Sequence, residues 1–385
     1  MTTHTVTTYA SATEVFRNRD LRQALYDEGD VVMADVLVNL HGDEHRDRRR
    51  LENRLYRRET LLRYERELFP DILEQTLRPH VETGHAELVT LGHQLMMNLA
   101  ALTAGIDRPL GTPAETERLY GYLRTFIEGA TLAHHTGDKA ATRAEVEAAL
   151  LDFDDEFLAP SIARRSSLAP EERPRDVLTV LLENIDDLRL PHEVVRREIA
   201  FYLLAGAHTS ATAFTRVLHH VFEWFATHPA DRSFATDVDF VQRCTYETIR
   251  LEPSSPVAVR RAESPCRLAN GLEIGVGDEV VIDLLAANRD PVVWGDDATA
   301  FDPWRTPPHR VPAWGLSLGS GMHHCIGGEL AAGAVLEHDR LHGLVPTSVL
   351  RMLELGCEPD PATAPTRDTS TARPYFSSYP VAFRR

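Results

Sequence analysis

The chain has 385 residues, a formal net charge of −17 at pH 7, 43% apolar residues and 26% charged residues. This composition is ordinary for a globular protein and excludes a mainly disordered or fibrous chain. No run approaches the roughly 18 apolar residues of a membrane-spanning helix, and we expect no signal peptide. The acidic charge disfavours nucleic acid as a partner, and four scattered cysteines without a CxxC pair favour a reducing, cytoplasmic location with no membrane partner.

The first 150 residues mix apolar and charged positions at helical spacing, which predicts mostly helices. The candidate helices there are Ala12–Leu25, Arg49–Leu73 and the largely apolar His93–Ala104. A longer helix is predicted from near Pro191 to about Thr227, because proline suits a first helical turn and His228-Pro229 is a natural stop. Gly206 inside this helix indicates either close helix packing or a bulky group that approaches the backbone.

The second half of the chain carries strand and turn signals. The predicted elements are a short helix at Phe240–Leu251, strands at Val257–Val259 and Val280–Ile282, a meandering loop over Arg289–Trp314 and a helix after Gly328. Asn270-Gly271 predicts a hairpin turn, because both residues tolerate a positive φ. We therefore predict a mainly α (α+β) fold with small sheets, in one domain over residues 1–385.

A glycine-rich segment over residues 318–328 surrounds a single cysteine, Cys325, just before the last of these helices. Glycines let the backbone approach a flat ligand and adopt a positive φ, and a helix N-terminus favours the thiolate form. A lone thiolate of this kind can ligate haem iron or act as a nucleophile. A structural cysteine buried in a glycine-rich turn is the third interpretation, and the segment alone leaves all three open.

Together with other segments, this loop resembles the cysteine loop of the cytochrome P450 family of haem-thiolate monooxygenases. The family's loop reads Phe-Gly-x-Gly-x-His-x-Cys-x-Gly, and here Leu318 replaces the phenylalanine. The residues that match it are Gly319, Gly321, His323, Cys325 and Gly327. Five further segments match the family's motifs in the family's order, and they are His45–Arg49, Ala205–Thr209, Glu247–Pro253, Ala287–Pro291 and Phe301–Arg305.

The resemblance implies haem b as the cofactor and Cys325 as the proximal iron ligand, in a loop shaped by the matching glycines. The residues that it places at the haem propionates are His45, Arg49, Arg260 and His323, with Arg261 as the alternative to Arg260. The residues that it assigns to holding the cysteine loop are Glu247, Arg250 and Arg305. The neighbouring Arg46, Arg48 and Arg50 are predicted to be solvated and to help dock an acidic electron donor.

The resemblance also assigns the oxygen side of the site to the long helix. The implied catalytic residues are Ala205, Gly206, His208 and Thr209. A kink at Ala205-Gly206 would open a groove for dioxygen, and in the family the threonine hydroxyl supports proton delivery. His208 stands where the family usually has an acid. It either relays protons, as an imidazole can near neutral pH, or only packs against the neighbouring helix.

The implied function is a monooxygenase that inserts one atom of dioxygen into a small, mainly apolar organic substrate, with electrons from a ferredoxin and its reductase. His208 favours a second hypothesis, a peroxygenase or an oxidative-coupling enzyme. A non-catalytic haem protein is the third. The substrate would meet the region Leu119–His135, whose apolar side chains include Tyr120, Tyr122 and Phe126. The His-x-x-x-Arg segment begins earlier than is usual for the family, which predicts a more open or differently closed pocket.

Overall fold

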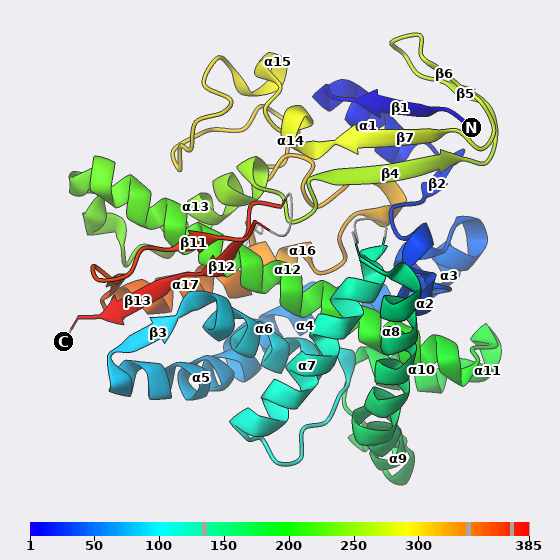
Figure 1. The fold of residues 1–385 in the computed structure, drawn as a ribbon, viewed down its shortest axis with the longest axis horizontal. Coiled ribbons are helices and arrows are strands. Elements are labelled where there is room, and N and C mark those ends of the chain that lie inside the picture. The colour runs from blue at the N-terminus through cyan, green and yellow to red at the C-terminus, as the bar shows by residue number, and fades with distance from the viewer. Residues whose placement is uncertain (133–136, 336–339, 370–372, 385) are drawn as a thin grey trace. The chain divides into compact units, whose positions relative to one another are not determined.

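The computed structural model describes residues 1–132, 137–335, 340–369 and 373–384 (Figure 1). His134 and His135, at the end of the expected substrate-lining region, lie outside the described residues. The chain divides into two compact units. Unit 1 comprises Met1–Leu21, Arg58–Gly92 and Thr209–Arg385, and unit 2 comprises Arg22–Arg57 and His93–His208. The single domain over 1–385 stays a prediction.

Helices dominate both units, which confirms the mainly α class. The helices of unit 1 are α1 (Tyr9–Arg17), α4 (Arg58–Arg63), α5 (Phe69–Thr83), α13 (Val238–Leu251), α14 (Leu284–Ala287), α15 (Pro291–Trp294), α16 (Gly328–Ala332) and α17 (Leu344–Glu354). The helices of unit 2 are α2 (Asp30–Met33), α3 (Gly42–Glu52), α7 (Pro113–Ala130), α8 (Lys139–Phe153), α9 (Ala159–Ser167), α10 (Val177–Glu183) and α11 (Ile185–Leu188). Three elements run from one unit into the other: β2 (Leu21–Gln23), α6 (Leu88–Ala104) and α12 (His192–Thr227).

The remaining strands lie in unit 1. They are β1 (Thr3–Val6), β3 (His85–Glu87), β4 (Val257–Ala262), β5 (Cys266–Arg267), β6 (Glu273–Ile274), β7 (Glu279–Asp283), β8 (Ala334–Val335), β9 (Arg340–Leu341), β10 (Cys357–Pro359), β11 (Thr366–Arg367), β12 (Phe376–Ser378) and β13 (Pro380–Phe383). In the largest sheet β7 lies between β1, to which it is parallel, and β4, to which it is antiparallel (Figure 1). In a second sheet β13 lies between β10 and β3. These small sheets flank helices rather than forming a layer of their own.

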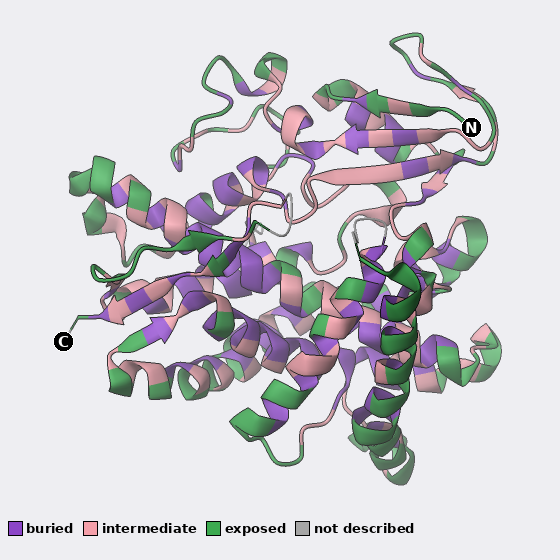
Figure 2. Cartoon of the chain, viewed as in Figure 1, coloured by how far each residue is buried: buried purple, intermediate pink, exposed green. Residues whose placement is uncertain are grey.

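The core of unit 1 beside the largest sheet forms because burial alternates along β7 and its buried β-branched residues pack with the apolar face of α1. Val280 and Ile282 are fully buried against Val15 and Ala12. The predicted hairpin is confirmed: β5 pairs with β6, and Gly271 has φ +90° while its N–H donates to the Leu268 carbonyl at 2.9 Å. Figure 2 shows the buried residues following the long helix α12 as well as the inner strands.

Two predicted helices end earlier than expected. The segment Ala12–Leu25 is helical only to Arg17, because Asn18 turns the backbone to extended geometry and strand β2 follows. The segment Arg49–Leu73 breaks where Arg57 adopts an extended conformation, between α3 and α4. The long helix and α13 match the prediction to within two residues. Among the described residues, no helix combines the length and the apolarity that crossing a membrane requires.

Unit 2 contains a buried polar cluster that corrects the prediction for Arg48. This arginine is 3% exposed rather than solvated, whereas Arg46 and Arg50 are exposed as predicted. Its guanidinium contacts the carboxylates of Glu198 on α12 and Glu52 on its own helix, and both carboxylates are fully buried. The correction has a physical reason: a buried arginine is tolerated where carboxylates neutralise it.

The same cluster holds the loop between α2 and α3. The backbone N–H of Leu37 donates to both carboxylate oxygens of Glu198, at 2.9 and 3.2 Å. Tyr202, one turn further along α12, donates its hydroxyl to Glu52. Two carboxylates surround one guanidinium here. Burial and the neighbouring Glu52 carboxylate raise the pKa of Glu198 to about 8, so a proton is retained in the cluster near neutral pH.

Glu198→Gln should remove a pH dependence of stability. The folded-state pKa of about 8 exceeds the ordinary carboxyl value of 4.5. The folded chain therefore keeps a proton that the unfolded chain releases between these values, and stability falls as pH rises through this window, by at most about 1.4 kcal/mol per pH unit. Urea unfolding at the two ends of the window should show wild type losing stability relative to the variant. A constant difference between the two proteins would contradict this assignment.

Candidate functional site

The cysteine loop lies in unit 1, between a short 3₁₀ turn at Gly321–His323 and α16. The backbone N–H of Cys325 donates to the Leu318 carbonyl at 2.8 Å, which closes the loop on itself. The Cys325 residue is exposed, whereas Cys244 and Cys357 are buried. Of the interpretations open from the sequence, a buried structural cysteine is therefore wrong. The thiol is presented at the surface of a closed loop.

Glycines shape this loop for steric reasons that the structure makes explicit. Gly319 and Gly321 have φ of +71° and +72°, a region that side chains disfavour. A Cβ on Gly321 would lie 2.6 Å from the backbone carbonyl oxygen of Phe16 on α1, so only glycine permits this contact. Gly327 instead has an ordinary negative φ, at the residue before α16. The loop thus needs glycine at positions 319 and 321 for its backbone conformation, and Gly321 also packs onto α1.

The predicted support of the loop is a buried ion network. Arg250 donates through Nε and Nη2 to the two carboxylate oxygens of Glu247, at 2.7 and 2.6 Å. Arg305 donates to the same carboxylate at 3.0 Å, and its other nitrogens bind Asp297. Arg250 is fully buried, and its remaining nitrogen, Nη1, donates to the carbonyl oxygens of Asn288 and Ala298. These contacts join α13 to the irregular segment that lies between the end of α15 and the cysteine loop.

Asn288 completes the link to the cysteine loop and was missed by the sequence analysis. Its fully buried side chain donates to the Arg250 carbonyl at 3.0 Å and accepts the Leu316 N–H at 2.8 Å. Ser317 bridges the same Asn288 to the carbonyl of Ile249 on α13. The sequence did contain a signal for Asn288, because this residue lies in the matching segment Ala287–Pro291. In the structure its side-chain amide is buried beside Arg250. Asn288 is thus the connector between the ion network and the loop.

Arg260, rather than Arg261, fits the predicted cofactor-binding position. Adjacent residues of β4 point to opposite faces of the sheet. Arg261 forms an ion pair with Glu279 at 2.6 Å, whereas the buried Arg260 guanidinium lies 5.1 Å from the ring centre of Phe16. Phe16 therefore contacts Arg260 through its ring and the cysteine loop through its carbonyl. His323 lies half-buried in the 3₁₀ turn of the loop.

The long helix α12 is α-helical without interruption through the predicted oxygen-side residues. In unit 1 the Thr209 residue is exposed, and its carbonyl accepts the Thr212 hydroxyl at 3.0 Å. In unit 2 Gly206 is exposed, while Ala205 and His208 are half-buried. A Cβ on Gly206 would lie 3.4 Å from Ala100 of α6, an ordinary contact. Packing against α6 alone therefore does not require a glycine at this position.

His45 and Arg49 lie on one face of α3 in unit 2, as their spacing predicts. His45 is buried, and Arg49 donates to Asn53 at 2.9 Å. Burial, with Arg49 and His41 nearby, lowers the pKa of His45 to about 4. Its imidazole is therefore neutral at pH 7 and suits a hydrogen bond rather than an ion pair. Arg49 remains the cationic group of this pair.

The aromatic residues expected near the substrate have different surroundings in unit 2. Phe126 is fully buried, and its ring meets that of Phe153 on α8 edge-on at 5.4 Å, so it belongs to the packing of α7 against α8. Tyr122 joins the same cluster through Phe153. Tyr120 instead lies 5.0 Å from His93 of α6. Of the three, Tyr120 is the one outside the α7–α8 core.

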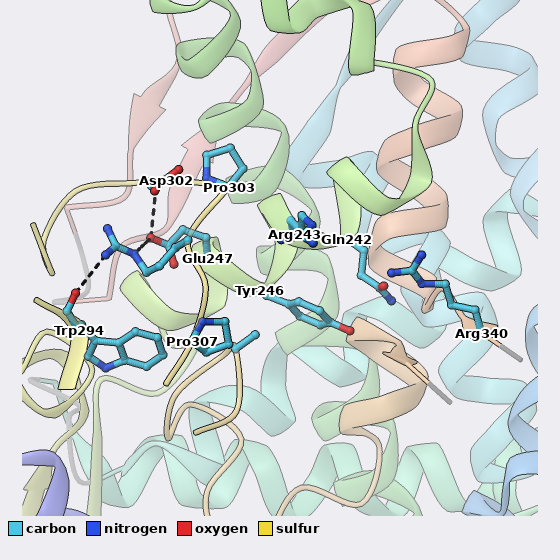
Figure 3. Close-up of a pocket in the computed structure, with 11 residues that line it drawn as sticks. Gln242, Arg243, Tyr246, Glu247, Trp294, Asp302, Pro303, Pro307 and Arg340 are labelled. Carbon is cyan, nitrogen blue, oxygen red and sulfur yellow. Dashed lines mark hydrogen bonds and ion pairs between the residues drawn. The ribbon is translucent and has the colours of Figure 1, made fainter. Parts of the chain in front are cut away.

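A pocket of about 180 Å³ opens in unit 1 beside the ion network (Figure 3). Its lining residues come from α13, α15, the irregular segment before the cysteine loop and β9, and they include Glu247, Arg305, Tyr246 and Arg340. None of the described residues predicted to meet haem or dioxygen lines it. Its volume is below the usual range for organic ligands, about 300–1,000 Å³. We therefore do not assign this pocket to the substrate.

The donor set of these residues fits haem b. An exposed cysteine in a closed loop offers a single soft ligand to iron. Arg260 and His323 in unit 1 are of the cationic and hydrogen-bonding types that propionates need, and so are Arg49 and His45 in unit 2. The roles of these residues toward the cofactor stay predictions.

Comparisons with known proteins point to one family. The family model "Cytochrome P450" matches residues 232–335, which contain the ion network up to the cysteine loop. A probable cytochrome P450 313a1 of Drosophila melanogaster is 26% identical over 162 residues, 36% of this chain and 32% of the relative. The bifunctional cytochrome P450/NADPH–P450 reductase 2 of Bacillus subtilis (strain 168) is 27% identical over 202 residues, 45% of this chain and 19% of the relative. The matches thus span about a third or less of these two relatives.

Solved structures extend the likeness to nearly the whole chain. The crystal structure of CalO2 has a TM-score of 0.78 and 22% identity, and covers 99% of this chain and 90% of that one. P450BioI, solved in complex with an acyl carrier protein ligated to hexadec-9Z-enoic acid, has a TM-score of 0.77 and 18% identity, and covers 98% and 91%. At these identities the likeness shows the fold. The fold, the family model over residues 232–335 and the cysteine loop all show similarity to the cytochrome P450 family.

Proposed function

We propose that the protein is a haem-thiolate monooxygenase with Cys325 as the proximal iron ligand. The observation that carries this proposal is the exposed Cys325 in a loop anchored, through Asn288, to the buried Glu247–Arg250–Arg305 network. Such an anchored loop keeps the thiol in one place, which ligation of a metal requires. When bound, haem would supply reductive activation of dioxygen, with the thiolate donating electron density to the iron.

The chain's own residues have separate roles in this proposal. Gly319, Gly321 and Gly327 shape the loop, and Arg260, His323, Arg49 and His45 hold the propionates. Ala205 and Gly206 leave the oxygen-side surface of α12 free of bulky side chains. Thr209 presents a hydroxyl from an exposed position on the same helix, and His208 precedes it. These two residues would hold and move protons, as the resemblance implies.

We propose a ferredoxin with its reductase as the electron source and a small, mainly apolar organic molecule as the substrate. The exposed Arg46 and Arg50 of α3 support the first proposal, because a cationic surface suits an acidic electron carrier. P450BioI has been solved with an acyl carrier protein ligated to hexadec-9Z-enoic acid, so carrier-bound substrates belong in the screen. The free cysteines support a reducing, cytoplasmic location.

His208 favours a second candidate function, a peroxygenase or an oxidative-coupling enzyme without net oxygen insertion. The His208 imidazole can exchange protons with hydrogen peroxide as well as with species derived from dioxygen. Turnover with ferredoxin, reductase and NADPH, compared with turnover on hydrogen peroxide alone, separates the two. Product formation that requires the reductase supports the monooxygenase. A non-catalytic haem protein would give product under neither condition.

Cys325→Ala should abolish the thiolate-type carbonyl spectrum of the reduced protein and all turnover, because it removes the iron ligand. The matched control is Cys244→Ala. Cys244 is fully buried in α13, and burial raises the pKa of its thiol well above the usual value, so it stays protonated. The control should keep the wild-type spectrum. A histidine-type carbonyl spectrum in intact wild-type protein would defeat the assignment of Cys325.

Glu247→Gln should destabilise the fold and release haem. The variant leaves Arg250 buried with an uncompensated charge, which typically costs about 3–5 kcal/mol. Glu279→Gln is the matched control, because its ion pair with Arg261 is partly exposed and such pairs contribute about 1 kcal/mol or less. Urea unfolding and the haem content of purified protein measure both effects. Equal effects of the two substitutions would show that the network does not hold the cysteine loop.

A further inference from the structure

Two histidines from different helices meet inside unit 2. Nε2 of His93 on α6 lies 3.4 Å from Nδ1 of His208 on α12, within hydrogen-bonding distance. Their rings are 5.6 Å apart with an interplanar angle of 29°. His93 is 6% exposed, and His208 is half-buried. The residue that occupies the family's acid position therefore has a second titratable ring as its neighbour.

The approach of α6 to α12 explains why these rings can meet. Gly206 of α12 faces Ala100 of α6, because a Cβ on Gly206 would lie 3.4 Å from that side chain, so the two helices are neighbours here. Packing alone would be served equally well by two apolar side chains, since it needs no nitrogen atoms. A pair of imidazoles instead places a donor opposite an acceptor, which apolar side chains cannot do.

A chain of rings continues from His93 toward solvent on α7. The ring of Tyr120 lies 5.0 Å from that of His93, and the exposed Arg124 guanidinium lies 5.2 Å from the centre of the Tyr120 ring. Exposure increases along this sequence, from the buried His93 to the half-buried Tyr120 and the exposed Arg124. His93 is thus the inner end of a row of ring contacts that reaches the surface of unit 2.

We propose that His93 and His208 form a two-histidine proton relay, in which His93 acts through His208. The proposal rests on the proposed monooxygenase function and identifies the group that resupplies His208 with protons. A proton enters at Nδ1 of His93, the Nε2 proton of His93 passes to Nδ1 of His208, and His208 releases its own Nε2 proton. One proton enters and one leaves, and no electrons move. Each ring is left as its other tautomer, and proton exchange with solvent, in which each ring loses its Nδ1 proton and gains one at Nε2, restores the starting tautomers.

The test uses holoenzyme labelled with ¹⁵N-histidine, in its reduced carbonyl form. In wild type, the ring nitrogens of His208 should carry the shifts of a hydrogen-bonded Nδ1 acceptor. In His93→Phe, which keeps a ring at this place, the Nδ1 resonance should move to the position of an imidazole without that donor. Unchanged His208 resonances would overturn the proposal. The resonances that disappear from the spectrum of His208→Phe are assigned to the ring nitrogens of His208.

Function is measured as dioxygen consumption with NADPH, ferredoxin and ferredoxin reductase, in H₂O and D₂O. His93→Phe should slow consumption about tenfold or more, because positioned proton-transfer groups typically contribute ~10²–10⁴-fold. The double variant with His208→Phe should be no slower than either single variant, as expected for residues that act as one unit. Additive losses would overturn the relay.

His93→Gln separates a relay from simple positioning, because glutamine still donates a hydrogen bond but cannot pass a proton through. The relay predicts that His93→Gln is as slow as His93→Phe. A His93→Gln variant with the wild-type rate would show that His93 only orients its neighbour. Tyr120→Phe, which keeps the ring, should retain the rate within about twofold. A thiolate-type carbonyl spectrum in every variant confirms that the haem site is intact. If the wild-type protein lacked the thiolate-type carbonyl spectrum, this would contradict the proposed function and not the relay.

Discussion

The fully buried guanidinium of Arg250 is the interaction on which the support of the cysteine loop in unit 1 depends. A charge removed from water costs several kcal/mol unless partners surround it, and here every partner comes from a different stretch of chain. Glu247 neutralises it from the preceding helical turn, while Asn288 and Ala298 contribute carbonyls. The irregular segment between α15 and α16 is built of turns, which do not by themselves fix its place on α13. Its contacts with Arg250, with Asn288 and between Arg305 and Glu247 together fix that place.

Unit 2 also has to compensate a buried charge, but there the excess charge is negative. Arg48 stands between Glu52 and Glu198, so negative charge exceeds positive charge unless one carboxyl keeps its proton. The Leu37 N–H then binds Glu198, which fixes a loop that has only short turns of its own. In unit 1 a buried cation organises carbonyls, and in unit 2 a buried carboxylate organises an N–H group. Each anchors an irregular segment that apolar packing alone would leave poorly specified.

The sequence predicted what is encoded locally or in a spaced motif. The cysteine loop, the hairpin at Asn270-Gly271 and the Glu247–Arg250 pair depend on neighbours within a few residues. Arg48 and His93 were misjudged or overlooked because their partners lie 150 and 115 residues away. Helical periodicity indicates which face a residue occupies and says nothing about what meets that face. The spacing of Glu198 from the buried Val195 and Tyr202 did contain a signal, because it places the carboxylate on the apolar face of α12.

The chemistry of imidazole explains why a histidine at position 208 needs a companion. A carboxylate can accept and release a proton at the same edge, because its two oxygens are equivalent. An imidazole can in addition take up a proton at one nitrogen and release it from the other, on the opposite side of the ring. A histidine that relays protons through its ring in this way needs a group that supplies its far nitrogen. In this chain that nitrogen, Nδ1 of His208, faces Nε2 of His93. The departure from the family's usual acid and the second histidine on α6 are then one feature rather than two.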